Sequence, residues 1–148
     1  MTRKKILVAM DFSEGSDEAL EQAIDLARQT GGQLEILHVL ELGADQFPFG
    51  LSYYDDNRGG LIALVDRELT ARTERAIKAG LIAESRIVEG SAATEIVRRA
   101  REGGAALIVI GTHGRRGLAH AVLGSVAERV VQYAACPVLT VPFSRRAA

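Results

Sequence analysis

A glycine-rich run from Gly111 to Gly117, followed by the pair Gly124-Ser125, carries the strongest chemical signal in this sequence. Glycine lets a backbone turn sharply and lie close to a ligand, because it has no side chain. A Gly-Ser pair that opens a helix offers free backbone N–H groups and a hydroxyl to an anion. The run starts where the apolar stretch 106–110 ends. Together these residues predict a phosphate-binding loop.

Neighbouring side chains could strengthen such a loop, since a helix dipole contributes only about 0.3–1 kcal/mol to anion binding. Arg115 and Arg116 are close enough in sequence to form charge-assisted contacts, or they form a solvated pair on the loop. His113 either contacts a phosphate or ribose, or shapes the loop through a hydrogen bond. Ser125 could equally cap its own helix, because Ser125 and Glu128 have the spacing of a capping box. Each residue thus has a structural interpretation beside the functional one.

The order of the predicted strands and helices places this loop in a fold. Apolar runs predict five strands, at residues 6–10, 34–42, 85–89, 105–110 and 137–141. Helical spacing and capping residues predict four helices, at residues 13–30, 61–79, 91–101 and from 125 onward. The alternation predicts a single α/β domain over residues 1–148, with an open five-stranded parallel sheet and helices on both faces. Right-handed crossovers give the strand order 3-2-1-4-5.

The stretch 43–60 predicts irregular structure, because Pro48, Gly50 and the pair Gly59-Gly60 interrupt it. Aromatic residues gather in the same stretch. A connection of this length inside a compact domain is usually functional or mobile. Two interpretations stay open here: a loop that covers the end of the core, and a lid over a ligand.

Two loops of the predicted sheet meet at one crevice. In such sheets, ligands bind beyond the carboxyl ends of the strands, where the winding direction reverses. Asp11 ends the first strand and Gly111 ends the fourth, so both lie at that reversal. The first loop lacks the glycine fingerprint of dinucleotide-binding folds, and its Glu14 and Asp17 would repel a phosphate. The chain also lacks the Gly-Lys-Ser/Thr triplet of a P-loop, so the phosphate site is assigned to the loop after the fourth strand.

Overall composition argues against several other classes of function. The 18 basic and 19 acidic residues give a formal charge of −1, which leaves no footprint for nucleic acid or an anionic membrane surface. Cys136 is the single cysteine, so no intrachain disulfide can form, and we interpret it as a small buried filler. No apolar run is long enough to span a bilayer. We expect a cytoplasmic protein with neither a membrane nor a nucleic-acid partner.

At the glycine loop the chain resembles the universal stress protein family, and the similarity extends over essentially its whole length. Nucleotide-binding members of that family carry Gly, two residues, Gly, nine residues, then Gly and Ser or Thr. This spacing is satisfied in full by Gly111, Gly114, Gly124 and Ser125. The opening 11–13 and the closing stretch 136–141 also look like the family's.

This resemblance implies a Rossmann-like adenine-nucleotide fold, with ATP as the ligand and Mg²⁺ carried on the phosphates rather than in a protein cage. Ala9, Asp11 and Val39 would surround the adenine and ribose, and Ile110 and Gly111 would lie along the nucleoside. The residues near the ribose and phosphates would be His113, Gly114, Gly124, Ser125 and Val126. The family often has proline where Ala9 stands, which would loosen the adenine edge.

The resemblance also implies a homodimer that pairs through the fifth strand, with contacts from Val138, Leu139 and Val141. The expected function is that of an ATP-binding stress-response regulator or sensor. The alternative is a slow ATP hydrolase, for which Asp11 and His113 are candidate general bases by location only. A phosphoacceptor receiver domain is rejected, because 89–91 lacks the acceptor aspartate and no lysine follows the fifth strand.

Overall fold

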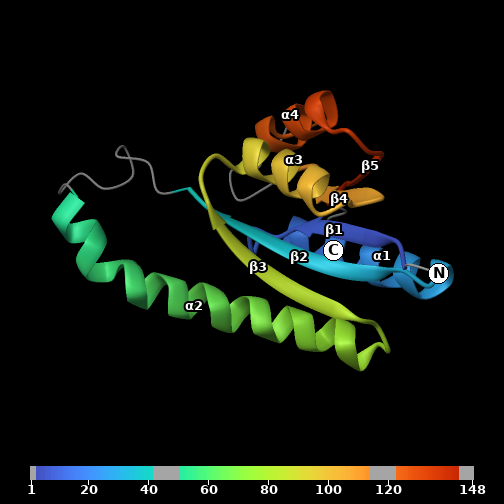
Figure 1. Ribbon diagram of the computed structural model, residues 1–148, viewed down its shortest axis with the longest axis horizontal. Coiled ribbons are helices and arrows are strands. Elements are labelled where there is room, and N and C mark those ends of the chain that lie inside the picture. Colours follow the sequence, from blue (N-terminus) through green and yellow to red (C-terminus); the bar gives the residue numbers. More distant parts are fainter. Residues whose placement is uncertain (1–2, 42–50, 114–122, 144–148) are drawn as a thin grey trace, which may run out of the picture.

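The computed structural model describes residues 3–41, 51–113 and 123–143, and for 51–58 the backbone alone. Its sheet has five parallel strands in the order β3-β2-β1-β4-β5, which confirms the predicted topology (Figure 1). The strands are β1 (Lys5–Ala9), β2 (Gln33–Leu40), β3 (Ala83–Glu89), β4 (Leu107–Gly111) and β5 (Val138–Val141). The helices are α1 (Glu14–Thr30), α2 (Leu51–Lys78), α3 (Ala92–Glu102) and α4 (Ser125–Tyr133).

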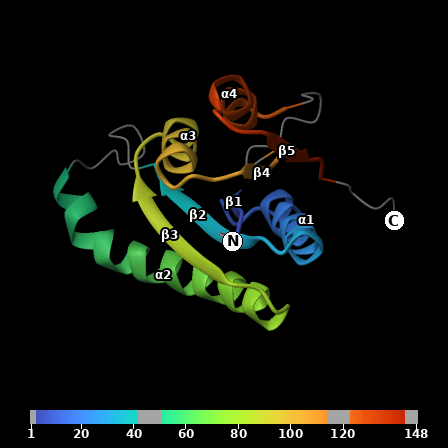
Figure 2. The same cartoon turned by 45° about the vertical axis from the view of Figure 1, so that its right-hand side comes forward.

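Helices cover both faces of this sheet, as Figure 2 shows. Side chains of a strand alternate between its two faces, so β1 contributes to two separate cores. Ile6 and Val8 pack with α1 and α2, whereas Leu7 and Ala9 pack with α3 and α4. Strand β1 is central and covered on both faces, which explains why its sequence is apolar without interruption.

Helix α1 begins and ends at the residues that sequence reasoning selected. The Ser13 hydroxyl accepts a hydrogen bond from the Ser16 N–H at 3.2 Å, as an N-cap does. Gly31 closes the helix in the left-handed conformation, with a φ of 72°. The end of α1 that faces the carboxyl edge of the sheet is therefore firmly defined.

Helix α2 corrects one prediction, because it already begins at Leu51 and residues 51–60 are helical rather than irregular. Residues 42–50 lie outside the described part of the chain. Gly59 and Gly60 each weaken a helix by about 1 kcal/mol relative to alanine. An established helix nevertheless propagates readily, since each added residue gains one hydrogen bond. In Figure 1 the N-terminal part of α2 extends past the sheet, so contacts with the sheet do not dictate its start.

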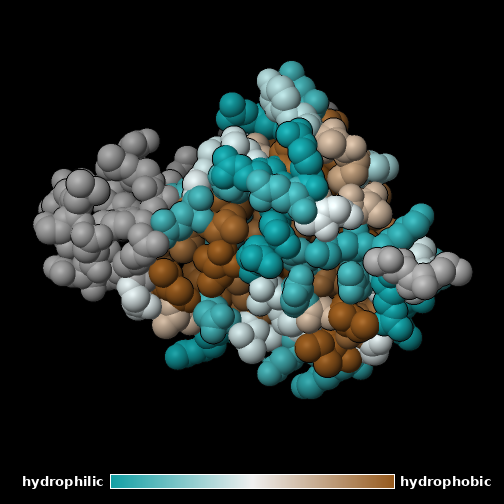
Figure 3. All heavy atoms as spheres, viewed as in Figure 1, coloured by the Kyte–Doolittle hydropathy of each residue, from teal (hydrophilic) through white to brown (hydrophobic). Residues whose placement is uncertain are grey.

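Few large apolar side chains of the helices are exposed to solvent. Figure 3 shows a hydrophobic area near the C-terminal end of α2 and another toward its N-terminal part. Ile77 near the end of α2 and Ile82 just after it are each about half exposed. Across the described residues, no helix combines the length and the apolar character that crossing a membrane requires.

Candidate functional site

Three segments that lie far apart in the sequence meet at the carboxyl edge of the sheet. The Thr112 N–H, just after β4, donates to the Val141 carbonyl at 3.0 Å. The Gly124 N–H, just before α4, donates to the Thr112 carbonyl at 2.5 Å. The first turn of α1 packs against the same place through Gly15, which lies beside the His113 carbonyl. The two predicted loops therefore do meet at one edge.

Glycines at this junction are required by contacts between backbones. A β-carbon on Gly111 would lie 2.9 Å from the Gly15 carbonyl oxygen, and one on Gly15 would lie 2.7 Å from the His113 carbonyl oxygen. A β-carbon on Gly124 would lie 2.9 Å from the Thr112 carbonyl oxygen. The open side of Gly111 therefore faces the first turn of helix α1.

Asp11 takes part in a compact hydrogen-bonded turn between β1 and α1. Its Oδ1 accepts from the Ser13 N–H at 3.0 Å and also from the Ser13 hydroxyl. The same hydroxyl caps α1 by accepting from Ser16. The carboxylate of Asp11 is therefore held in place at the end of β1 by its own turn.

Phe12, inside that turn, has a φ of 67°. This left-handed conformation costs a residue with a β-carbon about 1–2 kcal/mol. The Phe12 ring contacts the His38 ring, with 4.7 Å between the two ring centroids. The Arg72 guanidinium lies 4.9 Å from the centroid of the Phe12 ring. The His38 Nδ1 lies 2.7 Å from the Met10 carbonyl oxygen, so the histidine has a hydrogen-bond partner. These contacts hold the turn in its unfavourable conformation.

The N-termini of the helices differ in the side chains that cap them or lie near them. Helix α1 is capped by Ser13 and has Glu14 and Asp17 in its first turn. Helix α3 is capped from outside, because the Ala92 N–H donates to the Glu41 Oε1 at 2.8 Å. Both ends already face carboxylates, which makes them poor sites for a phosphate.

Helix α4 is the exception among these helices. Its N-cap is Gly124, and no side chain of the described residues bonds to that cap. Ser125 is the first helical residue and is exposed, so the predicted capping box is wrong. The one acidic residue of its first turn, Glu128, is exposed to solvent. Among the described residues, therefore, no side chain caps the backbone N–H groups of this turn.

Apolar candidates from the sequence share one face of the sheet, under α3 and α4. Ala9 is 8% exposed and Ile110 is 6% exposed, and both belong to the same core cluster. Val39 and Val126 are half-buried against that cluster. The structure thus brings these four apolar candidates together on one face.

The remaining candidates are placed only in part. His113 lies at the junction, with its Nδ1 3.1 Å from the Thr112 hydroxyl. Gly114, Arg115 and Arg116 lie outside the described residues. In the portion that the structure covers, no group of three or more His, Cys, Asp or Glu side chains is placed to hold a metal ion.

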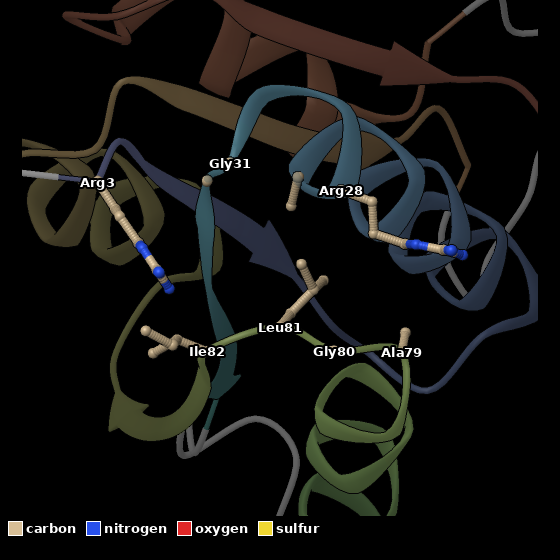
Figure 4. A pocket seen from close by; sticks show the side chains of 9 residues that line it. Arg3, Arg28, Gly31, Ala79, Gly80, Leu81 and Ile82 are labelled. Carbon is tan, nitrogen blue, oxygen red and sulfur yellow. The ribbon is translucent and has the colours of Figure 1, made fainter.

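A cavity of about 330 Å³ lies at the opposite edge, where α1 and α2 end (Figure 4). Arg3, Arg28 and Leu81 line it, together with Ile82 and several glycines and alanines. Its lining includes no carboxylate, imidazole, thiol or hydroxyl. The C-termini of α1 and α2 carry partial negative charge there, which counteracts the attraction of an anion by the two arginines. This cavity therefore offers no chemistry to compare with the junction.

Two groups of charged residues, one buried and one partly buried, escaped the sequence reasoning. The first is Glu35, 1% exposed, whose carboxylate receives two hydrogen bonds from Arg99 at 2.5 and 3.2 Å. Lys5 and Arg86 each approach it to 3.4 Å. Burial would raise the pKa of this carboxyl, but Arg99 and Lys5 outweigh burial and lower the pKa. An acid inside an otherwise apolar strand is the signal that could have revealed it.

The second group centres on Arg72, which contacts Phe12 and binds Asp17 and Glu68. Arg72 follows Leu69 by three residues and precedes Ala76 by four, which places it on the buried stripe of α2. A cation on such a stripe needs a buried partner. That position was the available signal, although it does not name the partner.

Comparisons with known proteins agree with this architecture. The model of the Universal stress protein family matches residues 2–142. Universal stress protein YxiE of Bacillus subtilis is 36% identical over 93% of this chain and 97% of its own. The solved structure of hypothetical protein MJ0577 is 26% identical, with a TM-score of 0.87 over 99% of this chain and 100% of that one.

Two further solved structures hold adenine nucleotides. A universal stress protein in complex with cAMP is 26% identical, with a TM-score of 0.70 over 97% of this chain and 100% of that one. The universal stress protein from Archaeoglobus fulgidus in complex with dAMP is 26% identical, with a TM-score of 0.71 over 95% and 99%.

Proposed function

The chain belongs to the universal stress protein family, and from that membership we propose that it binds ATP between the ends of β1 and β4. The observation that carries the proposal is the N-terminus of α4 at the junction of the two loops, which has an exposed Ser125 and no side-chain cap among the described residues. Such a terminus attracts phosphate through its N–H groups and its dipole. Relatives bound to cAMP and dAMP support an adenine nucleotide as the ligand class.

The nucleotide would use both halves of the junction. Its base and sugar would lie against the face that carries Ala9, Val39 and Ile110, which is apolar and suits an aromatic ring. Its phosphate oxygens would accept hydrogen bonds from the backbone N–H groups in the first turn of α4 and from the Ser125 hydroxyl. A divalent cation would ride on the phosphates, because Mg²⁺ in nucleotide sites is commonly held by phosphates and water.

We assign this site a regulatory role, in which the protein reports the presence of the nucleotide. A ligand that binds only the folded state adds about 2.7 kcal/mol of stability at a hundredfold excess over its dissociation constant. The alternative, slow hydrolysis of ATP, needs a base that activates water. Asp11 and His113 already form hydrogen bonds within their own loops, which favours binding over hydrolysis.

A thermal-shift titration with ATP, ADP and AMP, each with and without Mg²⁺, tests the proposal. The melting temperature should rise with nucleotide in the unaltered chain and rise less in Ser125→Ala. Ser91→Ala is the matched control, because Ser91 likewise stands at a helix N-terminus and its side chain forms no cap bond. Melting temperatures that do not respond to any nucleotide would remove the proposal. Phosphate release above the blank in a single-turnover assay would favour the hydrolase instead.

We also propose that two copies of the chain pair through β5. This strand has a neighbour on one side only in the described sheet, and an open edge of this kind favours pairing. Leu139 is 40% exposed, and Val131 and Tyr133 on the adjacent α4 are exposed as well. The side chain of Val141 is buried in the chain's own core, so Leu139 would supply more of the apolar contact than Val141. A sedimentation mass that is dimeric in the unaltered chain and monomeric in Leu139→Lys is expected, and a monomeric unaltered chain refutes the pairing.

A further inference from the structure

A cluster of side chains from three elements holds the β1–α1 turn from behind. Phe12 contacts His38 of β2 and Arg72 of α2, at 4.7 and 4.9 Å between the groups. The Phe12 backbone is left-handed, a conformation that persists in such a residue only where its surroundings enforce it. Asp11 and Ser13 flank this residue on either side, so their positions depend on how Phe12 is held.

Arg72 also fixes the start of α1. Its Nε donates to the Asp17 Oδ1 at 2.8 Å and its Nη2 donates to Oδ2 at 3.2 Å, which is a two-point contact. Glu68, one turn earlier on α2, holds the same guanidinium at 2.8 Å. The Arg72 side chain is 17% exposed, while its partners Asp17 and Glu68 are 36% and 46% exposed, so these contacts are only partly shielded from water and salt. The arginine thus connects α2 to both sides of the turn.

We infer that Arg72 is a positioning residue for the nucleotide site: by holding Phe12 in its left-handed conformation, it places Asp11 and Ser13 at the crevice. This inference rests on the proposed function and extends it to α2. Arg72 also neutralises Asp17, whose negative charge would otherwise stand in the turn that packs against the end of β4.

The test compares Arg72→Met with Arg75→Met. Methionine keeps an apolar side chain that resembles the aliphatic part of arginine, and it removes the charged guanidinium group. Arg75 lies three residues further along α2, is 56% exposed and forms an ion pair with Glu21 of α1, so it serves as a matched control. Affinity for ATP is measured by titration calorimetry well below each variant's melting temperature. Amide hydrogen exchange of Ser13 and Ser16 is measured in the ligand-free chain, which reports the turn without any nucleotide.

Arg72→Met should weaken ATP binding by about tenfold, which corresponds to the free-energy cost of one strained backbone conformation, that of Phe12. It should also speed hydrogen exchange at the amides of Ser13 and Ser16. Arg75→Met should leave both within about twofold. Equal ATP affinity in Arg72→Met and the unaltered chain overturns the inference alone. Absence of ATP binding by the unaltered chain overturns the proposed function, and the inference with it.

A second pair of variants covers the case in which Arg72→Met does not fold, and it tests the route through Phe12. Arg72→Lys keeps the charge without the guanidinium group, so its affinity should fall between those of the unaltered chain and the methionine variant. Glycine adopts a positive φ freely, so in a Phe12→Gly background the loss caused by Arg72→Met or Arg72→Lys should shrink below about threefold. An undiminished loss in that background overturns the inference.

Discussion

Replacing Arg99 with methionine should destabilise the fold strongly, because it strips the buried Glu35 of its main partner. Arg99 gives Glu35 two charge-assisted hydrogen bonds, and a bond of that kind contributes about 1.5–3 kcal/mol. Lys5 and Arg86 stay at 3.4 Å and offset part of the loss. We therefore expect Arg99→Met to lower the free energy of unfolding by about 3 kcal/mol, the lower end for a broken buried ion pair.

Urea unfolding at pH 7 measures this loss, with Arg98→Met as the control. Arg98 is 56% exposed and pairs with Glu95 one turn away, so its removal should change stability by less than about 0.5 kcal/mol. The double variant Glu35→Met/Arg99→Met should recover much of the loss, since no buried charge is left unpaired. Equal unfolding midpoints for Arg99→Met and Arg98→Met would refute the reasoning.

The same pair predicts a pH dependence. Although burial opposes ionisation, Arg99 and Lys5 hold the pKa of Glu35 below its ordinary value of 4.5 in the folded chain. The unfolded chain therefore binds the proton more readily, and the stability that Glu35 provides is complete above pH 4.5 and is lost as the pH falls through the folded pKa. The gap between the unaltered chain and Arg99→Met should accordingly be widest near neutral pH and should narrow below pH 4.5.

Three further predictions concern single residues. Gly111→Ala should lower the melting temperature even without nucleotide, since its β-carbon would lie 2.9 Å from the Gly15 carbonyl oxygen; an unchanged melting temperature contradicts the contact. Glu41→Gln should lower the unfolding free energy by about 0.5–1 kcal/mol, because the carboxylate that receives the Ala92 N–H becomes neutral; stability equal to that of the unaltered chain argues against this cap. Burial raises the pKa of the Cys136 thiol, so iodoacetamide should alkylate it at pH 7 more slowly than free cysteine, and equal rates would show an accessible thiolate.

The fold was predictable from sequence because its signals are local. Apolar runs and capping residues such as Ser13 and Gly31 act within a few positions, and the strand order follows from connection rules. Helix α2 shows the limit of this reasoning, because Gly59 and Gly60 suggested a break that a nucleated helix passes through.

Sequence reasoning located the candidate site but did not explain how it is built. The reversal of winding placed Asp11 and Gly111 at one edge, which the structure confirms. Arg72 could not be paired with Phe12 in advance, because the two residues are brought together only by the packing of α2 on the sheet. Contacts between residues so distant in sequence depend on the complete fold, whereas a periodic pattern records only which face a residue occupies.

The backbone contacts of Gly15, Gly111 and Gly124 have a consequence for reading related sequences. Selection for folding alone would preserve these glycines, since a β-carbon at any of them would strike a neighbouring carbonyl. A descendant that had lost its ligand would therefore keep much of the glycine spacing for a long time. Ser125 is different, because it is exposed and caps no helix, so packing places little demand on it. In a set of homologues, the drift of this serine would separate chains that bind a phosphate from chains that merely retain the architecture.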